Sequence, residues 1–174
     1  MATTTAPTGF GRPIWSAIKG GNQVHGVGLS AVTNCFEGKD ASFSRVLFTA
    51  PQSATGGFWK IDAATIVPVT TIAAHGANKW KFKLQVATLN AAGTSVTPTD
   101  LGDAEYTTDT AIAMTAGLPV SLDVDGPENA SPKLTYLAPG DSIFLVATKV
   151  SSGVDQSDNY FTVTLFMRNS PPGR

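Results

Sequence analysis

Large apolar residues and polar residues alternate strictly between residues 79 and 86. The apolar set is Trp80, Phe82, Leu84 and Val86, and the polar set is Lys79, Lys81, Lys83 and Gln85. Successive side chains of a β-strand point to opposite faces, whereas an α-helix would spread both sets around its circumference. The stretch 79–89 is therefore predicted to be a half-buried strand, with one face toward a core and a row of ammonium groups on the other.

Short apolar runs bounded by glycine, proline, asparagine or aspartate predict further strands along the chain. Pro68 cannot donate a ladder hydrogen bond, which places its run at a sheet edge or at a bulge. The stretch 142–150 is apolar almost throughout, which indicates a central strand covered on both faces. The polar stretches 93–109 and 151–158 are predicted to be surface loops. The predicted strands are 43–49, 58–61, 64–72, 79–89, 111–115, 118–124, 133–137, 142–150 and 160–168.

This pattern predicts an all-β fold, namely an antiparallel β-sandwich of jelly-roll type with an extended N-terminal arm. No segment shows a helical period over about ten residues. An immunoglobulin-like sandwich is the alternative, although its cysteine pair cannot exist in a chain with one cysteine. The expected organisation is an arm at 1–40, a sandwich at 41–169 and a tail at 170–174.

Residues 1–40 differ from the rest of the chain, because they are rich in glycine and their apolar residues follow no sustained period. We interpret them as an arm in which Phe10, Ile14 and Trp15 are candidate anchors. The anchors could dock on a neighbouring subunit, on the chain's own sandwich or on nothing, since terminal segments are often poorly tied down. Residues 24–32 could form a short strand. The first residues carry neither the basic nor the apolar region of a secretion signal.

The composition is low in charge. Charged residues make up 14% of the chain, against about 25% in typical domains. Twelve Lys and Arg oppose 13 Asp and Glu, for a formal charge of -1, which argues against a nucleic-acid partner. No apolar run approaches the roughly 20 residues that span a bilayer, so no membrane partner is expected. A weakly charged surface is also typical of proteins whose neighbours cover much of it.

No grouping of residues predicts catalysis. The two histidines, His25 and His75, form neither an HxH nor an HExxH pair, so the ligand spacing of cupins and zincins is absent. Cys35 has no activating partner in its neighbourhood and is interpreted as a small buried residue. The aspartates at 100–109 and 123–125 could offer oxygens to calcium, but their spacing is not that of an EF-hand and fits ordinary turns. The prediction is a non-enzymatic protein with no cofactor and no metal.

Two surface features have alternative interpretations. Lys79, Lys81 and Lys83 could form a solvated face that discourages aggregation, or a contact patch for an acidic protein surface. Trp15, Trp59 and Trp80 could form a platform for sugar stacking, but Trp59 and Trp80 lie in apolar, strand-like runs, which favours core packing.

Several parts of the chain, taken in order, are similar to a known class of proteins. They are the arm rich in glycine and threonine, the run 58–72, the alternating strand that ends in Asn90-Ala91-Ala92-Gly93, and the turn Ala138-Pro139-Gly140-Asp141 before the apolar strand. In this layout, over about residues 43–168, the chain resembles the jelly-roll capsid decoration (cement) proteins of tailed bacteriophages.

The resemblance implies a virion protein that sits on the capsid surface, stabilises the particle and is assembled in the cytoplasm of the host bacterium. It implies the major capsid protein as a partner, and self-association as a homotrimer. The arm anchors and the lysine face would be the binding residues. The alternative is a carbohydrate- or receptor-binding β-sandwich module of a phage fibre or tail, which would use the loops 93–109 and 151–158.

Overall fold

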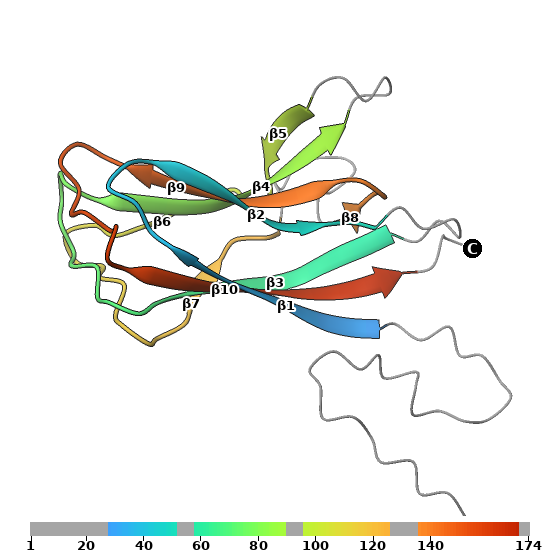
Figure 1. The fold of residues 1–174 in the computed structure, drawn as a ribbon, viewed down its shortest axis with the longest axis horizontal. Helices are drawn as coiled ribbons and strands as arrows, with labels where there is room; N and C mark the ends of the chain where they lie inside the picture. Colours follow the sequence, from blue (N-terminus) through green and yellow to red (C-terminus); the bar gives the residue numbers. More distant parts are fainter. Residues whose placement is uncertain (1–27, 52–57, 90–95, 126–135, 171–174) are drawn as a thin grey trace, which may run out of the picture.

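Two antiparallel sheets of five strands each make up the described part of the chain. The computed structural model describes residues 28–51, 58–89, 96–125 and 136–170. Figure 1 shows the two sheets as layers with their long strands running along the molecule, and the described residues include no helix. Sheet A contains β1 (Gly28–Glu37), β10 (Tyr160–Ser170), β3 (Phe58–Pro68), β7 (Val120–Leu122) and β8 (Tyr136–Leu137). Sheet B contains β2 (Phe43–Thr49), β9 (Ser142–Lys149), β4 (Trp80–Leu89), β5 (Val96–Asp100) and β6 (Tyr106–Thr107).

The order of the strands is that of a jelly roll. Sheet A has the order β1-β10-β3-β7, with β8 also paired to β3, and sheet B has the order β2-β9-β4-β5, with β6 also paired to β4. Each early strand therefore pairs with a late one, as when a long hairpin is rolled up into two sheets. The predicted jelly-roll sandwich is confirmed, and the immunoglobulin-like alternative does not fit this order.

Aromatic rings fill the centre of the space between the sheets. Phe161 of sheet A lies 5.6 Å from Phe82 and 6.4 Å from Phe43 of sheet B, measured between ring centroids. Trp80 lies 6.3 Å from Phe82 and 6.2 Å from Phe43. All four side chains are buried. Ring pairs at these distances stabilise a core beyond the burial of their area, so this cluster holds the two sheets together.

The strands predicted with most contrast are confirmed. In β4, Trp80, Phe82, Leu84 and Val86 are buried, whereas the lysines and Gln85 are half-buried on the outer face. β9 lies between β2 and β4, the central position that its apolar run predicts. Its outer face is half-buried, however, and not fully covered as expected.

The predicted turn at Ala138-Pro139-Gly140-Asp141 also forms. The Asp141 N–H donates to the Ala138 carbonyl at 3.0 Å, and the buried Asp141 carboxylate accepts the Ala138 N–H at 2.8 Å. Gly140 has a φ of 92°, which glycine adopts at little cost. Two hydrogen bonds between Asp141 and Ala138 therefore fix the turn that leads into β9.

Each sheet contains one β-bulge. In β3 the extra residue is Asp62, because the residues on either side of it face consecutive residues of β10. In β2 the extra residue is Leu47, for the same reason against β9. Pro68 is neither at a bulge nor in an edge strand, since it ends β3 between β10 and β7, where no further ladder donor is needed.

Two further local predictions, both on the stretch 93–115, are wrong. Within the stretch 93–109, predicted to be a loop, β5 and β6 pair with β4, and Leu101 and Thr108 are fully buried. The polar composition and Pro98 conceal these short strands. The strand predicted at 111–115 does not form, because Met114 makes only an isolated bridge with Ile72. One buried side chain without alternating neighbours does not make a strand.

β1 lies inside the stretch predicted to be an arm. Its ten residues pair with β10 without a register shift, from Gly28 opposite Asn169 to Glu37 opposite Tyr160. Residues 28–37 therefore belong to the sandwich, contrary to the boundary at residue 40. The possible strand at 24–32 covers only residues 28–32 of β1, and the alternation is weak because the outward residues at the centre of β1 are small and uncharged. The arm anchors Phe10, Ile14 and Trp15 and the tail 171–174 lie outside the described residues.

Replacing Phe36 with alanine tests whether β1 is part of the cooperative core. The Phe36 ring lies 5.9 Å from Phe161 and 6.1 Å from Phe43, so Phe36→Ala should lower the free energy of unfolding by roughly 2–3 kcal/mol. Cys35→Ala, on the exposed face of the same strand, is the control and should change it by about 0.5 kcal/mol or less. Urea unfolding measures both. An unchanged Phe36→Ala midpoint would mean that β1 unfolds separately from the sandwich.

Candidate interaction surface

Four connections gather at one end of the sandwich, on the left in Figure 1. They are residues 38–42, 69–79, 108–119 and 150–159, which join β1 to β2, β3 to β4, β6 to β7 and β9 to β10. Successive long strands run in opposite directions, so alternate connections fall at the same end. We call these four connections, together with Tyr160 at the start of β10, the loop end.

Asn159 holds three of these connections together. Its buried side chain accepts the Thr70 N–H at 2.8 Å and donates to the Thr70 carbonyl at 2.9 Å and to the Gln156 side-chain oxygen at 2.8 Å. Its backbone carbonyl accepts the Gly38 N–H at 2.8 Å. A Cβ on Gly38 would collide with the Gln156 carbonyl, so glycine allows this close approach. The loop end is therefore cross-linked by buried hydrogen bonds.

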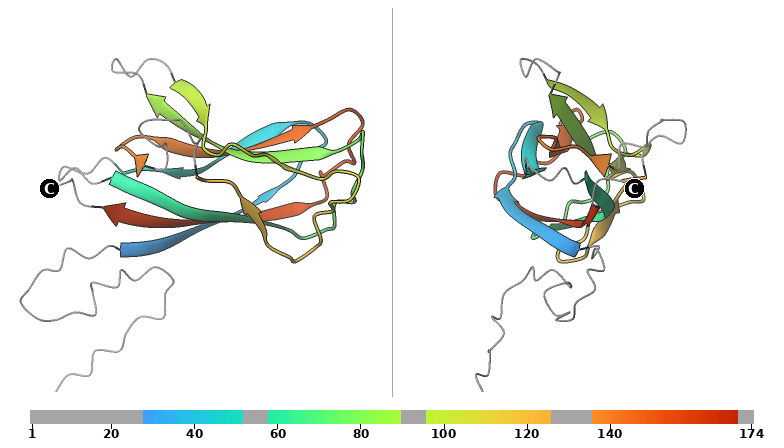
Figure 2. Two further views of the ribbon diagram at one scale, coloured as in Figure 1. Left: turned by 180° about the vertical axis from the view of Figure 1, so that it is seen from behind. Right: turned by 90° about the vertical axis from the view of Figure 1, so that its right-hand side faces the viewer.

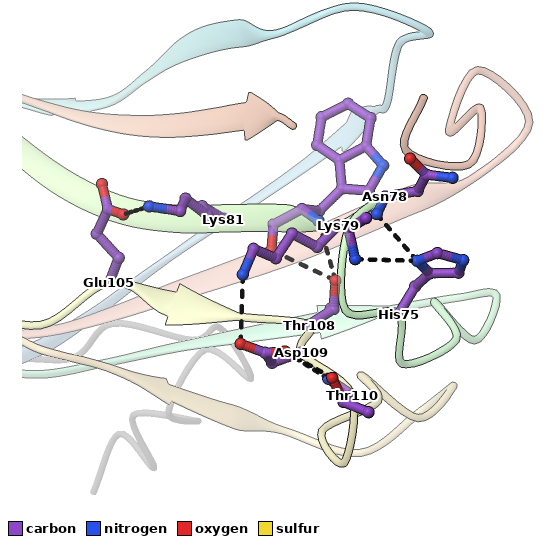
Figure 3. A network of polar contacts seen from close by, with 10 residues as sticks. His75, Asn78, Lys79, Lys81, Glu105, Thr108, Asp109 and Thr110 are labelled. Atoms are coloured by element: carbon purple, nitrogen blue, oxygen red, sulfur yellow. Dashed lines mark hydrogen bonds and ion pairs between the residues drawn. The ribbon is translucent and has the colours of Figure 1, made fainter. Parts of the chain in front are cut away.

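Trp80 provides a second cross-link. Its indole N–H donates to the Val154 carbonyl at 2.8 Å, and its backbone N–H donates to the Thr108 hydroxyl at 2.9 Å. The Thr108 N–H donates in turn to the Trp80 carbonyl at 2.9 Å. The core residue Trp80 thus fixes the connections that begin at residues 108 and 150. Figure 3 shows Thr108 close to the lysine contacts.

His75 shapes the connection between β3 and β4. Its Nδ1 accepts the backbone N–H of Asn78 at 2.9 Å and of Ala77 at 3.2 Å, as Figure 3 shows for the pair of dashed lines at its ring. The Asn78 side chain accepts the Ser152 N–H at 3.2 Å. The ring therefore acts as a local turn cap, which uses the nitrogen that a general base would need.

The loop end exposes large apolar side chains. Eight such side chains are exposed in the described residues, and five of them, between 47% and 61% exposed, are here: Val69, Ile112, Leu118, Val154 and Tyr160. Backbone hydrogen bonds bring Val69, Leu118 and Tyr160 together. The Val69 N–H donates to the Tyr160 carbonyl at 2.8 Å, and the N–H of Gly117, next to Leu118, donates to the carbonyl of Pro68, next to Val69, at 2.9 Å. Exposed apolar groups on a rigid support are typical of protein-binding surfaces.

Each lysine of the predicted contact patch is paired with an acid of the same chain. Lys79 lies 3.3 Å from Asp109, Lys81 lies 2.7 Å from Glu105, and Lys83 lies 2.9 Å from Asp100, measured from ammonium nitrogen to carboxylate oxygen. The acids come from β5 and from the residues next to β6, and both strands pair with β4. Figure 3 shows the pairs of Lys79 and Lys81. The lysine face is therefore nearly neutral, and its binding to an acidic partner remains a prediction.

These ion pairs change the protonation of their members. Hydrogen bonds from Lys81 lower the pKa of Glu105, and the Asp100 carboxylate raises the pKa of Lys83. Burial works against ionisation of Asp100, but hydrogen bonds from Lys83 and Gln85 outweigh it and lower its pKa. On the outer face of sheet A, hydrogen bonds from Arg168 lower the pKa of Asp62. The shifted pKa values keep the Asp62, Asp100 and Glu105 carboxylates and the Lys83 ammonium group charged at neutral pH.

The other candidate groups serve local structure. The Asp123 carboxylate accepts the N–H groups of Ala104 at 2.9 Å and of Asp125 at 3.1 Å, so it stabilises turns. Cys35 is exposed, contrary to the prediction, because it lies on the outer face of β1, where its thiol meets the Thr162 hydroxyl at 3.2 Å. Within the described ranges no three His, Cys, Asp or Glu side chains are grouped to hold a metal ion, and no helix there could cross a bilayer.

Comparisons with known proteins give no family. No protein-family model and no curated protein sequence matches the chain. A chain in the structure of infectious bursal disease virus Gx strain is 13% identical with a TM-score of 0.44, and the match covers 95% of this chain but 38% of that one. A chain of turnip yellow mosaic virus is 10% identical with a TM-score of 0.37 over 85% of this chain and 96% of that one. PirA is 7% identical with a TM-score of 0.35 over 78% of this chain and 93% of its own. At these values the likenesses carry no argument, and the fold rests on the strand order.

The pattern of the sequence predicts the lysine face but not the loop end. Asn159 and Gln156 stand in a polar stretch without any motif, so nothing marks them as buried. Val69 and Leu118 stand next to Pro68 and Pro119, and the pattern assigns them to strands. Only the three-dimensional arrangement shows that these residues share one end of the molecule.

Replacing Asn159 with alanine tests whether the loop end is rigid because of its buried hydrogen bonds. Asn159→Ala leaves the backbone N–H and the carbonyl of Thr70 without their side-chain partner, so the free energy of unfolding should fall by roughly 1–3 kcal/mol. The matched control Asp158→Asn, at an exposed neighbour, should change it by about 0.5 kcal/mol or less. Urea unfolding and hydrogen exchange of 69–72 give the readout. Equal stability of the two variants would contradict the role of the Asn159 hydrogen bonds in holding the loop end together.

The ion pairs predict loss of stability in acid. The carboxyls of Asp62, Asp100 and Glu105 have lowered pKa values in the folded chain, below their ordinary 3.8 for aspartate and 4.5 for glutamate. Their contribution is therefore complete above pH 4.5 and is lost as the pH falls through the lowered values. Urea unfolding should show a level free energy between about pH 5 and 8 and a decline below that range. A free energy that rises on acidification would contradict these pairs.

Proposed function

We propose that this chain is a non-enzymatic structural protein of a virus particle, a decoration protein that binds the outer capsid lattice and stabilises it. The observation that carries the proposal is the loop end, where exposed apolar side chains stand on connections fixed by buried hydrogen bonds. The class of function comes from the resemblance to phage decoration proteins, which is an analogy at the level of fold. Residence on the capsid surface and assembly in a bacterial cytoplasm belong to the same proposal.

The loop end would bind the shell by desolvation. Val69, Leu118 and Tyr160 are each more than half exposed in the free chain. Burying them against the major capsid protein would remove apolar surface from water without ordering the loops first, because the loops are already held. The neutralised lysine face offers little long-range attraction, so it would form part of a polar rim and not the centre of the contact.

Repetition over the lattice would turn a modest contact into firm retention. If each copy also ties to a neighbour, loss of one contact leaves the others in place, which is the physical basis of avidity. Phe10, Ile14 and Trp15 are proposed as such a second contact.

The alternative, a carbohydrate- or receptor-binding module, has less support. Part of the first loop that it would use is formed by β5 and β6, and the second is bound to Asn78 and Trp80. Trp80 is fully buried, and Trp59 packs edge-to-face on Phe48 at 5.3 Å, so neither offers a free ring for stacking on a sugar.

Co-sedimentation with empty shells of the major capsid protein from the same genome tests the proposal. The wild-type chain should sediment with the shells, and the double variant Val69→Ser and Leu118→Ser should bind at least about tenfold more weakly with an unchanged fold. Val46→Ser removes an equally exposed valine, 56% against 61% for Val69, from the outer face of sheet B and is the matched control.

Two results would overturn the proposal. Absence of wild-type binding to the shells, or absence of a capsid gene from the genome, would refute the decoration function. Equal binding by the double variant and by Val46→Ser would be consistent with a decoration protein but would show that the loop end is not its contact with the shell. The same assay on Phe10→Ala with Trp15→Ala measures the share of the arm.

A further inference from the structure

Besides the two-residue strands β6 and β8, four strands of the described residues lie at sheet edges, and three of these four carry features that oppose pairing with another chain. Unpaired edges are templates for strand addition, and proteins protect them with bulges, prolines or short strands. β2 has a bulge at Leu47, β5 is five residues long and contains Pro98, and β7 is three residues long and follows Pro119. These three edges are therefore poor partners for an added strand.

β1 has none of these features. It is ten residues long, pairs with β10 without a register shift, and contains no proline, lysine or arginine. Figure 2 shows it at the margin of sheet A, beside β2 of the other sheet. Its described outer-face residues at the centre are small and uncharged: Ala31, Thr33 and Cys35. A long, regular edge without charge at its centre is the geometry that strand addition requires.

The edge of β1 is also held in place. The Asn34 side chain donates to the Leu47 carbonyl at 2.8 Å, which ties β1 to the bulge of β2 across the gap between the sheets. The Thr33 hydroxyl lies 3.2 Å from the Thr164 hydroxyl of β10, and the Cys35 thiol lies 3.2 Å from that of Thr162. In an antiparallel ladder alternate residues direct their N–H and C=O groups away from the partner, so β1 presents an ordered row of donors and acceptors outward.

We infer that this edge binds the β1 strand of a second copy of the chain, antiparallel, so that two A sheets join into one. A second copy offers the same uncharged strand centre, with Ala31, Thr33 and Cys35, and charge selects the direction. The single charged residue of β1 is Glu37, at its end. Antiparallel pairing about a two-fold axis near Thr33 puts the two Glu37 side chains at opposite ends, whereas parallel pairing in register would put them side by side.

This assembly is a dimer and not the homotrimer that the resemblance implies. It goes beyond the proposed function and does not depend on it, because it uses the side of sheet A and leaves the loop end free. Two joined copies would present two loop ends, which is the arrangement that avidity on a lattice needs.

Light scattering of the full chain tests the inference. The wild-type chain should have a solution mass of twice 18.0 kDa. Thr33→Lys brings two ammonium groups together at the axis and should give the monomer at the same protein concentration. Ser121→Lys, an exposed change on the same face of sheet A but in the opposite edge strand β7, is the control and should remain a dimer.

A crosslink gives a second readout that does not depend on disrupting the edge. With Cys35→Ser in place, Thr33→Cys should form a disulfide-linked dimer on mild oxidation, and Ser121→Cys should not. A wild-type monomer or trimer would overturn the inference, as would a Thr33→Lys dimer. A chain that is a monomer at full length but a dimer when it starts at residue 28 would show that residues 1–27, and not a second copy, cover the edge.

Discussion

The packing of the Phe161 ring joins the two sheets and the first strand of the sandwich. The ring touches Phe82 and Phe43 of sheet B and Phe36 of β1, and it comes within reach of the backbone at Gly38. Two residues earlier, Asn159 makes the buried hydrogen bonds of the loop end. The same short segment therefore joins the sheets, attaches the first strand and supports the loops. Loss of this packing would disturb all three at once.

The electrostatics of the molecule are local. Lys79, Lys81 and Lys83 are each paired with an acid from a neighbouring segment, and Arg168 is paired with Asp62. Ion pairs of this kind on a surface contribute little to stability and leave little field at a distance. The surfaces that remain for recognition are apolar or made of backbone: the exposed side chains of the loop end and the edge of β1. Recognition by such surfaces depends on shape and desolvation more than on charge.

The sequence predicts the fold class and its strongest strands because buried and exposed residues differ most there. The alternation of Trp80 to Val86 and the turn at Pro139-Gly140 each point to one structure. The pattern fails where polar residues occupy strands, as in β5 with Pro98, and where the outward residues are small, as in β1. It also cannot show that Lys83 has an acidic partner, since Asp100 reaches it only through the pairing of β4 with β5. The loop end is the clearest case, because Asn159 and Thr70 are distant in sequence and adjacent in space.

Hydrogen exchange of the chain, measured free and bound to its shell, would locate the contact surface. Binding should slow exchange in the loop end, in residues 69–72, 112–118 and 150–156, beyond the protection that the buried hydrogen bonds already give in the free chain. Slowed exchange confined to the outer face of β4 and β9, with the loop end unchanged, would contradict the loop end as that surface.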